Sequence, residues 1–144
     1  MHRILIDSDV VLDLFMAREP HHSIALRFFS YLDLNSDTVI GYASPIAIAN
    51  VIYILTKAQS QTYAIKKIRA LRQMLRIVPI DEAVVSTAIQ VPGKDFEDTL
   101  QYHCAVASEL TAIVTRNVKD YPRDVISILT PQEFLAMDFM EKST

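Results

Sequence analysis

The chain has 144 residues, a formal net charge of −3 and 51% hydrophobic residues, which allows a packed core and excludes a disordered composition. No apolar run reaches the roughly 18 residues of a membrane-spanning helix, and the N-terminal run is too short for a signal peptide. Because Cys104 is the only cysteine, we expect a cytoplasmic protein. We expect no membrane contact, and the length fits a single domain over residues 1–144.

Short apolar runs alternate with helical patterns along the chain. Strands are predicted at residues 3–6, 38–43, 76–80, 112–115 and 125–129. Helical patterns begin near residues 20, 44, 61, 81, 95 and 130, and we expect the third to run to residue 75 and the fifth to about residue 110. This alternation predicts an α/β fold in which helices cover both faces of a parallel sheet.

Acidic and amide side chains gather where the predicted strands end. Asp7 directly follows the first strand, Asn117 and Asp120 follow the fourth, and Asp95 and Asp98 begin the helix before the fourth. Ligands of parallel sheets bind beyond the carboxyl ends of the strands, so we expect these side chains at one rim. Oxygen ligands without histidine or cysteine suit Mg²⁺ or Mn²⁺, which can activate water for attack on a phosphodiester.

Each of these residues also has a purely structural interpretation. Asp7 can cap a helix over residues 8–15, and Asp95 and Asp98 can complement a helix dipole. Asn117 and Asp120 are typical of a polar turn. Asn50 lies in an apolar helical stretch, where a buried amide needs a hydrogen-bond partner. The metal hypothesis therefore depends on the convergence of separate segments.

A basic segment lies between residues 57 and 80, which contain no acidic residue. Its members Lys66, Arg69, Arg72 and Arg76 are predicted to form a stripe beside the core face of the helix that begins at residue 61. The stripe can be a solvated helix face, a dimer surface, an RNA-binding surface or the site that an acidic partner segment covers.

Four stretches together resemble the PIN domain family, especially bacterial VapC-like toxins and their stand-alone relatives. They are LIDSDVVLDLFMAREP, ASPIAIANVIYIL, DFEDTLQYHCA and IVTRNVKDY. The resemblance implies a three-layer α/β/α sandwich with a five-stranded parallel sheet. It also implies a metal-dependent endoribonuclease that cleaves RNA, is usually a homodimer and is often inhibited by an antitoxin protein.

The resemblance also assigns roles to individual residues. It implies that Asp7, Asp98 and Asp120 hold Mg²⁺ or Mn²⁺, and that Asn50 and Asn117 stand where the family usually has carboxylates. Supporting positions are Ser8, Asp95 and Thr115. The two asparagines remove negative charge from the site, so weaker metal binding is expected.

Two other functions remain open at this point. A PIN-like module that has weakened or lost catalysis, and that binds RNA or protein, explains both asparagines. A phosphoacceptor receiver domain has a similar order of elements, with Asp81 after the third strand and Thr115 after the fourth. It requires a lysine before the proline that follows the fifth strand, where this chain has Thr130 and Pro131.

Overall fold

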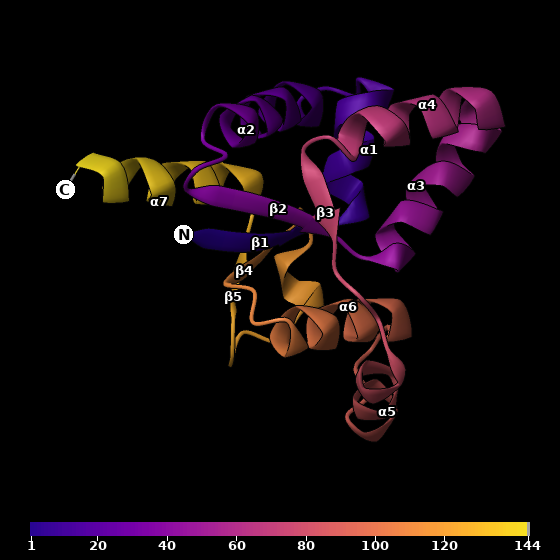
Figure 1. The fold of residues 1–144 in the computed structure, drawn as a ribbon, viewed down its shortest axis with the longest axis vertical. Coiled ribbons are helices and arrows are strands. Elements are labelled where there is room, and N and C mark those ends of the chain that lie inside the picture. The colour runs from indigo at the N-terminus through magenta and orange to yellow at the C-terminus, as the bar shows by residue number, and fades with distance from the viewer. Residues whose placement is uncertain (144) are drawn as a thin grey trace.

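The computed structural model describes the backbone of residues 1–143 and the side chains of residues 1–137. Within them, five parallel strands form one sheet in the order β3-β2-β1-β4-β5 (Figure 1). The strands are β1 (His2–Ile6), β2 (Val39–Ala43), β3 (Leu75–Ile77), β4 (Ala112–Val114) and β5 (Ser127–Leu129). The α/β/α sandwich with a five-stranded parallel sheet is therefore confirmed.

Helices cover both faces of this sheet (Figure 1). One face is covered by α1 (Ser8–Met16), α2 (His21–Leu34), α3 (Pro45–Ala58), α4 (Gln61–Leu71) and α7 (Pro131–Ser143). The other face is covered by α5 (Glu82–Gln90) and α6 (Phe96–Ala107). A single 3₁₀ turn, η1 (Val118–Asp120), lies between β4 and β5.

The central strand β1 is buried on both faces because its side chains alternate between two hydrophobic clusters. Ile4 and Ile6 pack under α1 to α4, whereas Leu5 packs under α6. The chain runs outward from β1 through β2 to β3 and returns to β4 on the opposite side. The carboxyl end of β1 therefore lies at the point where strand order reverses, which is the usual ligand position in such sheets.

Helix starts follow the capping residues in the sequence. Ser44 caps α3 by accepting a hydrogen bond from the backbone N–H of Ala47, at 3.1 Å. Asp81 caps α5 and Asp95 caps α6 in the same way. Among the described helices, none combines the length and apolar character needed to cross a bilayer.

Several predicted boundaries are wrong. The helix expected to continue to residue 75 ends at Leu71, and Leu75 instead begins β3, paired with Gly41. Leu75 is buried in β3, and a buried leucine suits a helix or a strand equally, so its hydrophobicity does not distinguish the two. As a result Arg72 and Arg76 are not on the helix that carries Lys66 and Arg69. The strands predicted at residues 76–80 and 125–129 are also too long, because β3 ends at Ile77 and β5 begins at Ser127.

Candidate functional site

Asp7 is buried at the carboxyl end of β1, with 8% of its surface exposed. Its Oδ1 accepts hydrogen bonds from the Ser8 backbone N–H at 2.7 Å and from Gln101 Nε2 at 3.1 Å. Its Oδ2 accepts hydrogen bonds from Thr115 Oγ1 at 3.0 Å and from the Tyr121 hydroxyl at 2.9 Å. All of these donors are neutral, so they orient the carboxylate without removing its negative charge.

The Gln101 amide has its orientation fixed by Ser44. Ser44 Oγ already accepts from the Ala47 N–H and donates to Gln101 Oε1 at 2.6 Å. The Gln101 Nε2 group is therefore turned toward Asp7 and also donates to the Tyr121 hydroxyl at 3.0 Å. In this way the start of α3 holds a side chain of α6 against the end of β1.

Asp98 is joined to Asp7 through Tyr121. The Tyr121 hydroxyl lies 3.3 Å from Asp98 Oδ1 as well as 2.9 Å from Asp7 Oδ2. Burial, followed by the negative charges of Asp7, Asp95 and Asp120, raises the pKa of Asp98 to about 6. Asp95, Asp98 and Asp7 are thus close in space, as expected for the rim. Asp120 lies in the exposed η1 turn, and its charge reaches Asp98.

Asp9, in the first turn of α1, is a further acidic residue that the sequence reasoning did not single out. Its Oδ2 accepts hydrogen bonds from the Arg116 backbone N–H at 3.2 Å and from Asn117 Nδ2 at 3.0 Å. Its Oδ1 is buried and, within the described residues, has no hydrogen-bond partner. Burial and the charge of Asp7 together raise the pKa of Asp9 to about 7. A buried carboxylate oxygen without a protein donor is satisfied by a proton, a cation or a water molecule.

Arg116 carries the nearby positive charge. Its Nε and Nη2 atoms lie 2.7 and 3.2 Å from the two carboxylate oxygens of Asp13, which is only 3% exposed. This bidentate pair fixes the segment after β4 against α1. The guanidinium is therefore already engaged, and it is the Arg116 backbone N–H that donates to Asp9.

The two asparagines act as hydrogen-bond donors. Asn117 donates to Asp9, as described, and Asn50 donates to Glu97 Oε2 at 3.4 Å. The expectation that Asn50 is buried among apolar residues is wrong, because Ala47, Val51 and Leu55 form the buried face of α3 and Asn50 is only partly buried beside it. A carboxylate at either position could not donate and would face another carboxylate.

The predicted metal ligands do not form a complete cage. Among the side chains that the structure describes, no three His, Cys, Asp or Glu groups are close enough to hold one ion together. The ligand set Asp7, Asp98 and Asp120 therefore stays a prediction. Asp7 and Asp98 are the pair that the structure brings together, through Tyr121, and Asp9 adds the unpaired oxygen.

Sequence reasoning missed Gln101, Tyr121, Asp9 and the Asp13–Arg116 pair. Gln101 lies three residues after Asp98 on α6, and Tyr121 directly follows Asp120. Helical spacing places Gln101 on the same side of α6 as Asp98, and this signal could have identified it. The pairing of Asp13 with Arg116 links residues 103 positions apart and left no local signal in the sequence.

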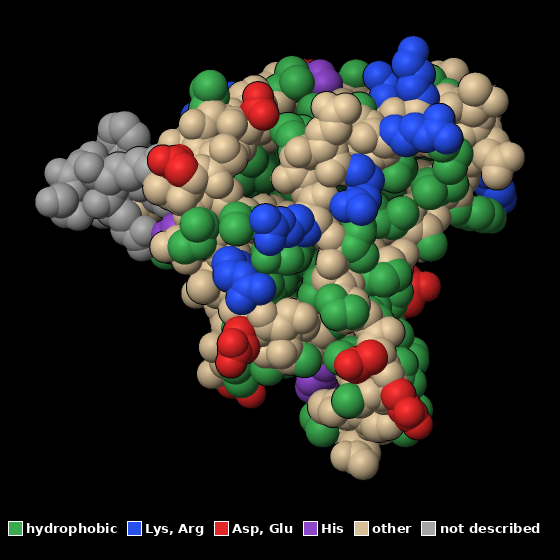
Figure 2. Space-filling model, viewed as in Figure 1, with side chains coloured by type: hydrophobic (Ala, Val, Ile, Leu, Met, Phe, Trp, Pro, Cys, Tyr) green, Lys and Arg blue, Asp and Glu red, His purple; other side chains and the backbone are tan. Residues whose placement is uncertain are grey.

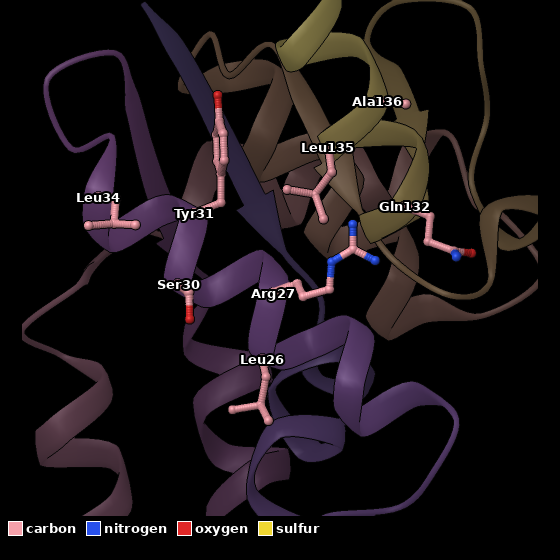
Figure 3. A pocket seen from close by; sticks show the side chains of 8 residues that line it. All are labelled: Leu26, Arg27, Ser30, Tyr31, Leu34, Gln132, Leu135 and Ala136. Carbon is pink, nitrogen blue, oxygen red and sulfur yellow. The ribbon is translucent and has the colours of Figure 1, made fainter.

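A hollow lies between α2 and α7. It is separate from the acidic cluster at the end of β1, which consists of Asp7, Asp9, Asp95, Asp98 and Asp120. It has a volume of about 690 Å³, and its lining includes Leu26, Arg27, Leu34 and Leu135 (Figure 3). Its lining contains no acidic residue, so it does not share the chemistry of the β1 rim.

Basic side chains gather on another surface. Lys and Arg residues spread from α4 across β3 in Figure 2, and Lys66, Arg69, Arg72 and Arg76 are all exposed. The predicted helical stripe is thus wrong in its geometry, because its last two members leave α4. The positive surface itself exists.

A family model for the PIN domain matches residues 3–119. A relative described as Ribonuclease VapC1 from Aquifex aeolicus (strain VF5) is 29% identical over 137 residues, covering 92% of each chain. The match to the family model extends from β1 to η1 and so includes Asp7, Asp98 and Thr115.

Solved structures with the same fold come from bacterial toxin–antitoxin systems. VapBC2 from Rickettsia felis, bound to promoter DNA, gives a TM-score of 0.64 at 15% identity, covering 88% of this chain and 96% of that chain. A toxin–antitoxin complex from Klebsiella pneumoniae gives 0.64 at 21% identity, covering 89% and 97%. VapC20 from Mycobacterium tuberculosis, a toxin that cleaves the sarcin-ricin loop, gives 0.61 at 14% identity, covering 76% and 86%.

Proposed function

This chain belongs to the PIN domain family, and from that premise we propose that it is a divalent-metal-dependent endoribonuclease that hydrolyses RNA phosphodiesters. In this proposal residues 1–144 form one domain that acts in the cytoplasm as the toxin of a toxin–antitoxin pair, or as a relative of such toxins. The relative described as Ribonuclease VapC1 and the toxin–antitoxin structures support this assignment.

The observation that carries the proposal is the pairing of Asp7 and Asp98 around one tyrosine hydroxyl. Two carboxylates held this close repel each other, and the raised pKa of Asp98 reflects that repulsion in addition to its burial. A cation relieves it. Mg²⁺ is often bound by only one or two carboxylates together with water, so a complete protein cage is not required.

The chain's own residues would bind and orient the cation and the substrate. Asp7 and Asp98 would be its main ligands, with Asp120 approaching from the η1 turn. Thr115, Gln101 and Tyr121 hold the Asp7 carboxylate in place by hydrogen bonds. When bound, Mg²⁺ or Mn²⁺ supplies Lewis-acid stabilisation of the charge that develops on the phosphate oxygens.

Asn50 and Asn117 support the acidic cluster in this proposal. Each amide donates to a carboxylate, Asn117 to Asp9 and Asn50 to Glu97, and so offsets part of the local negative charge. Ser8 supplies its backbone N–H to Asp7, and Asp95 caps α6 and so positions Asp98. These contacts give the asparagines a role that does not require loss of catalysis.

Partners follow from the charged surfaces and the relatives. The exposed Lys66, Arg69, Arg72 and Arg76 would contact RNA phosphates, while the acidic rim would hold the cation. An antitoxin protein is proposed as the inhibitor because the structural neighbours include toxin–antitoxin complexes. A homodimer is proposed as the active assembly.

Cleavage of a mixed RNA substrate in Mn²⁺ tests this function. We expect cleavage by the wild type and by Asp37→Asn, an exposed acid outside the site, and a loss of about 100-fold or more in Asp7→Asn. A chelator should stop cleavage in every protein. Equal cleavage by wild type and Asp7→Asn, or cleavage that survives the chelator, would refute the mechanism. Absence of cleavage with retained RNA binding would identify an inactive binding module instead.

A further inference from the structure

A second hollow opens directly beside the acidic cluster. It has a volume of about 260 Å³, and Asp98 and Asp120 line one part of it. The rest of the lining comes from the loop before α6, from α6 and from the segment before β5. Its apolar and aromatic members include Val91, Pro92, Tyr102, His103, Val106 and Val125. A group linked to a phosphate at the acidic cluster would therefore reach a mainly apolar space.

The size of this hollow suits one ring system. It is several times the roughly 30 Å³ that a water molecule occupies in the liquid, and just below the roughly 300 Å³ at which drug-sized pockets begin. Tyr102, His103 and Val106 contribute from one face of α6, since residues four apart lie above one another on a helix. Single-stranded RNA is commonly recognised by bases that leave the stack and pack against such side chains.

Asp124 supplies a hydrogen-bond acceptor at the same hollow. Its Oδ1 accepts a hydrogen bond from the Tyr102 hydroxyl at 2.7 Å, so the tyrosine is fixed and its own proton is committed. Burial and the neighbouring Asp124 carboxylate raise the pKa of Tyr102 to about 12, which keeps the hydroxyl protonated. Asp124 is exposed and remains ionised, and a carboxylate can accept more than one hydrogen bond.

Two exposed valines border the hollow. Val91 and Val125 are 59% and 63% exposed, and neither belongs to the two hydrophobic clusters of the core. They line the hollow together with Pro92. Apolar side chains left in water beside a charged site are available to a ligand.

We propose that this hollow binds the nucleobase next to the phosphodiester held at the acidic cluster, and that it prefers a base carrying an exocyclic amino group, such as cytosine, over uracil. The apolar and aromatic walls provide contact area for the ring. Asp124 provides the selection, because its carboxylate accepts from an amino group and repels the carbonyl oxygen that uracil presents in the same place. This inference rests on the proposed nuclease function for the identity of its ligand.

Binding of cytidine and uridine tests the pocket without any catalysis. The protein is labelled at its valine methyl groups and titrated with each nucleoside in the presence of a chelator, while methyl NMR spectra are recorded. We expect the signals of Val91, Val106 and Val125 to shift, and that of Val51, on the buried face of α3, to stay in place. Cytidine should bind about fivefold or more tightly than uridine.

Two variants separate the contribution of apolar contact to nucleoside binding from that of hydrogen bonding. Val125→Asn should weaken the binding of both nucleosides about three- to tenfold, because it removes apolar contact. Ile89→Asn is the control and should leave binding unchanged, although Ile89 is 64% exposed, about as much as Val125. Asp124→Asn keeps an acceptor oxygen for Tyr102 and adds an N–H donor. It should abolish the preference for cytidine.

The results distinguish failure of the pocket from failure of the nuclease. Unshifted pocket valines at saturating nucleoside, or equal weakening by Val125→Asn and Ile89→Asn, would overturn the pocket. Equal affinity for cytidine and uridine would overturn the selection by Asp124. A protein that binds cytidine here but cleaves no RNA in Mn²⁺ keeps the pocket and loses the nuclease assignment. A protein that cleaves RNA but binds neither nucleoside here loses only the pocket.

Discussion

The hydroxyl of Tyr121 lies between two carboxylates, 2.9 Å from Asp7 Oδ2 and 3.3 Å from Asp98 Oδ1. It has one proton to donate, so only one of the two acids receives its hydrogen bond at a time. Burial and the two negative charges raise the pKa of Tyr121, which keeps that proton in place. The tyrosine thus links the end of β1 to the start of α6.

Replacing Tyr121 by phenylalanine removes this link and keeps the ring that packs under α6. In the presence of a chelator, which removes divalent cations, we expect Tyr121→Phe to lower the free energy of unfolding by about 1–3 kcal/mol, because hydrogen bonds to charged groups are lost. Mn²⁺ should raise the melting temperature of the variant more than that of the wild type, since the cation then replaces the missing donor. Urea and thermal unfolding with and without Mn²⁺ measure both effects. Equal stabilisation by Mn²⁺ in the two proteins would contradict the link.

Stability without divalent cations should fall as the pH rises. The pKa of Asp9 is raised from 3.8 to about 7 and that of Asp98 from 3.8 to about 6, so the folded protein holds more protons than the unfolded chain across this window. The slope of stability against pH is then negative. The stability that the protonated Asp9 and Asp98 contribute is lost as the pH rises through these pKa values and is gone above pH 7. Asp98 is partly exposed, so we assign to it only about 1 kcal/mol of the pH-dependent change in the free energy of unfolding. Unfolding at pH 5 and pH 8 in the presence of a chelator measures the slope. Asp98→Asn should make the slope shallower and leave the contribution of Asp9. A flat profile in the wild type would refute the predicted dependence.

The pair formed by Asp13 and Arg116 should show strong coupling. Arg116→Met leaves the buried Asp13 without its bidentate partner, and we expect a loss of about 2–3 kcal/mol, discounted because a third of the arginine side chain is exposed. Adding Asp13→Leu should recover most of that loss, because an apolar pair replaces the unpaired charge. A double-mutant cycle by urea unfolding measures the coupling. Additive losses would show that the two residues act independently.

Contacts between RNA phosphates and the basic surface should be sensitive to salt. In an Asp7→Asn background, which prevents cleavage, Lys66→Ala and Arg69→Ala should each lower RNA affinity at low salt. Each should also reduce the slope of log affinity against log salt by about 0.7. Arg27→Ala on α2 removes an equal charge from a different surface and serves as the control. Unchanged slopes in the α4 variants would place the RNA elsewhere.

Local rules predicted the elements well where one residue decides. Ser44, Asp81 and Asp95 begin helices as expected, because a capping side chain acts on backbone only three residues away. The predicted end of α4 was wrong because a buried leucine at position 75 is compatible with a helix and with a strand. The strands β3 and β5 were predicted too long, since apolar residues continue beyond the positions at which each strand pairs with its neighbour.

The site divides in the same way. The positions of Asp7 and Asp98 near one rim followed from sheet topology, which the apolar runs already indicate. The roles of Gln101 and Tyr121 did not, because they depend on which rotamers meet across 20 residues of sequence. The donor role of Asn117 likewise depends on Asp9, a residue at the other end of the chain.

The placement of β4 beside β1 has a consequence for protein synthesis. β1 emerges first from the ribosome, yet its end is completed by Thr115 and Tyr121, which are translated more than a hundred residues later. Until then Asp7 lacks two of its hydrogen-bond donors and β1 lacks a neighbouring strand. The rim at the end of β1, where Tyr121 links Asp7 to Asp98, is therefore completed only when nearly all of the chain has been made.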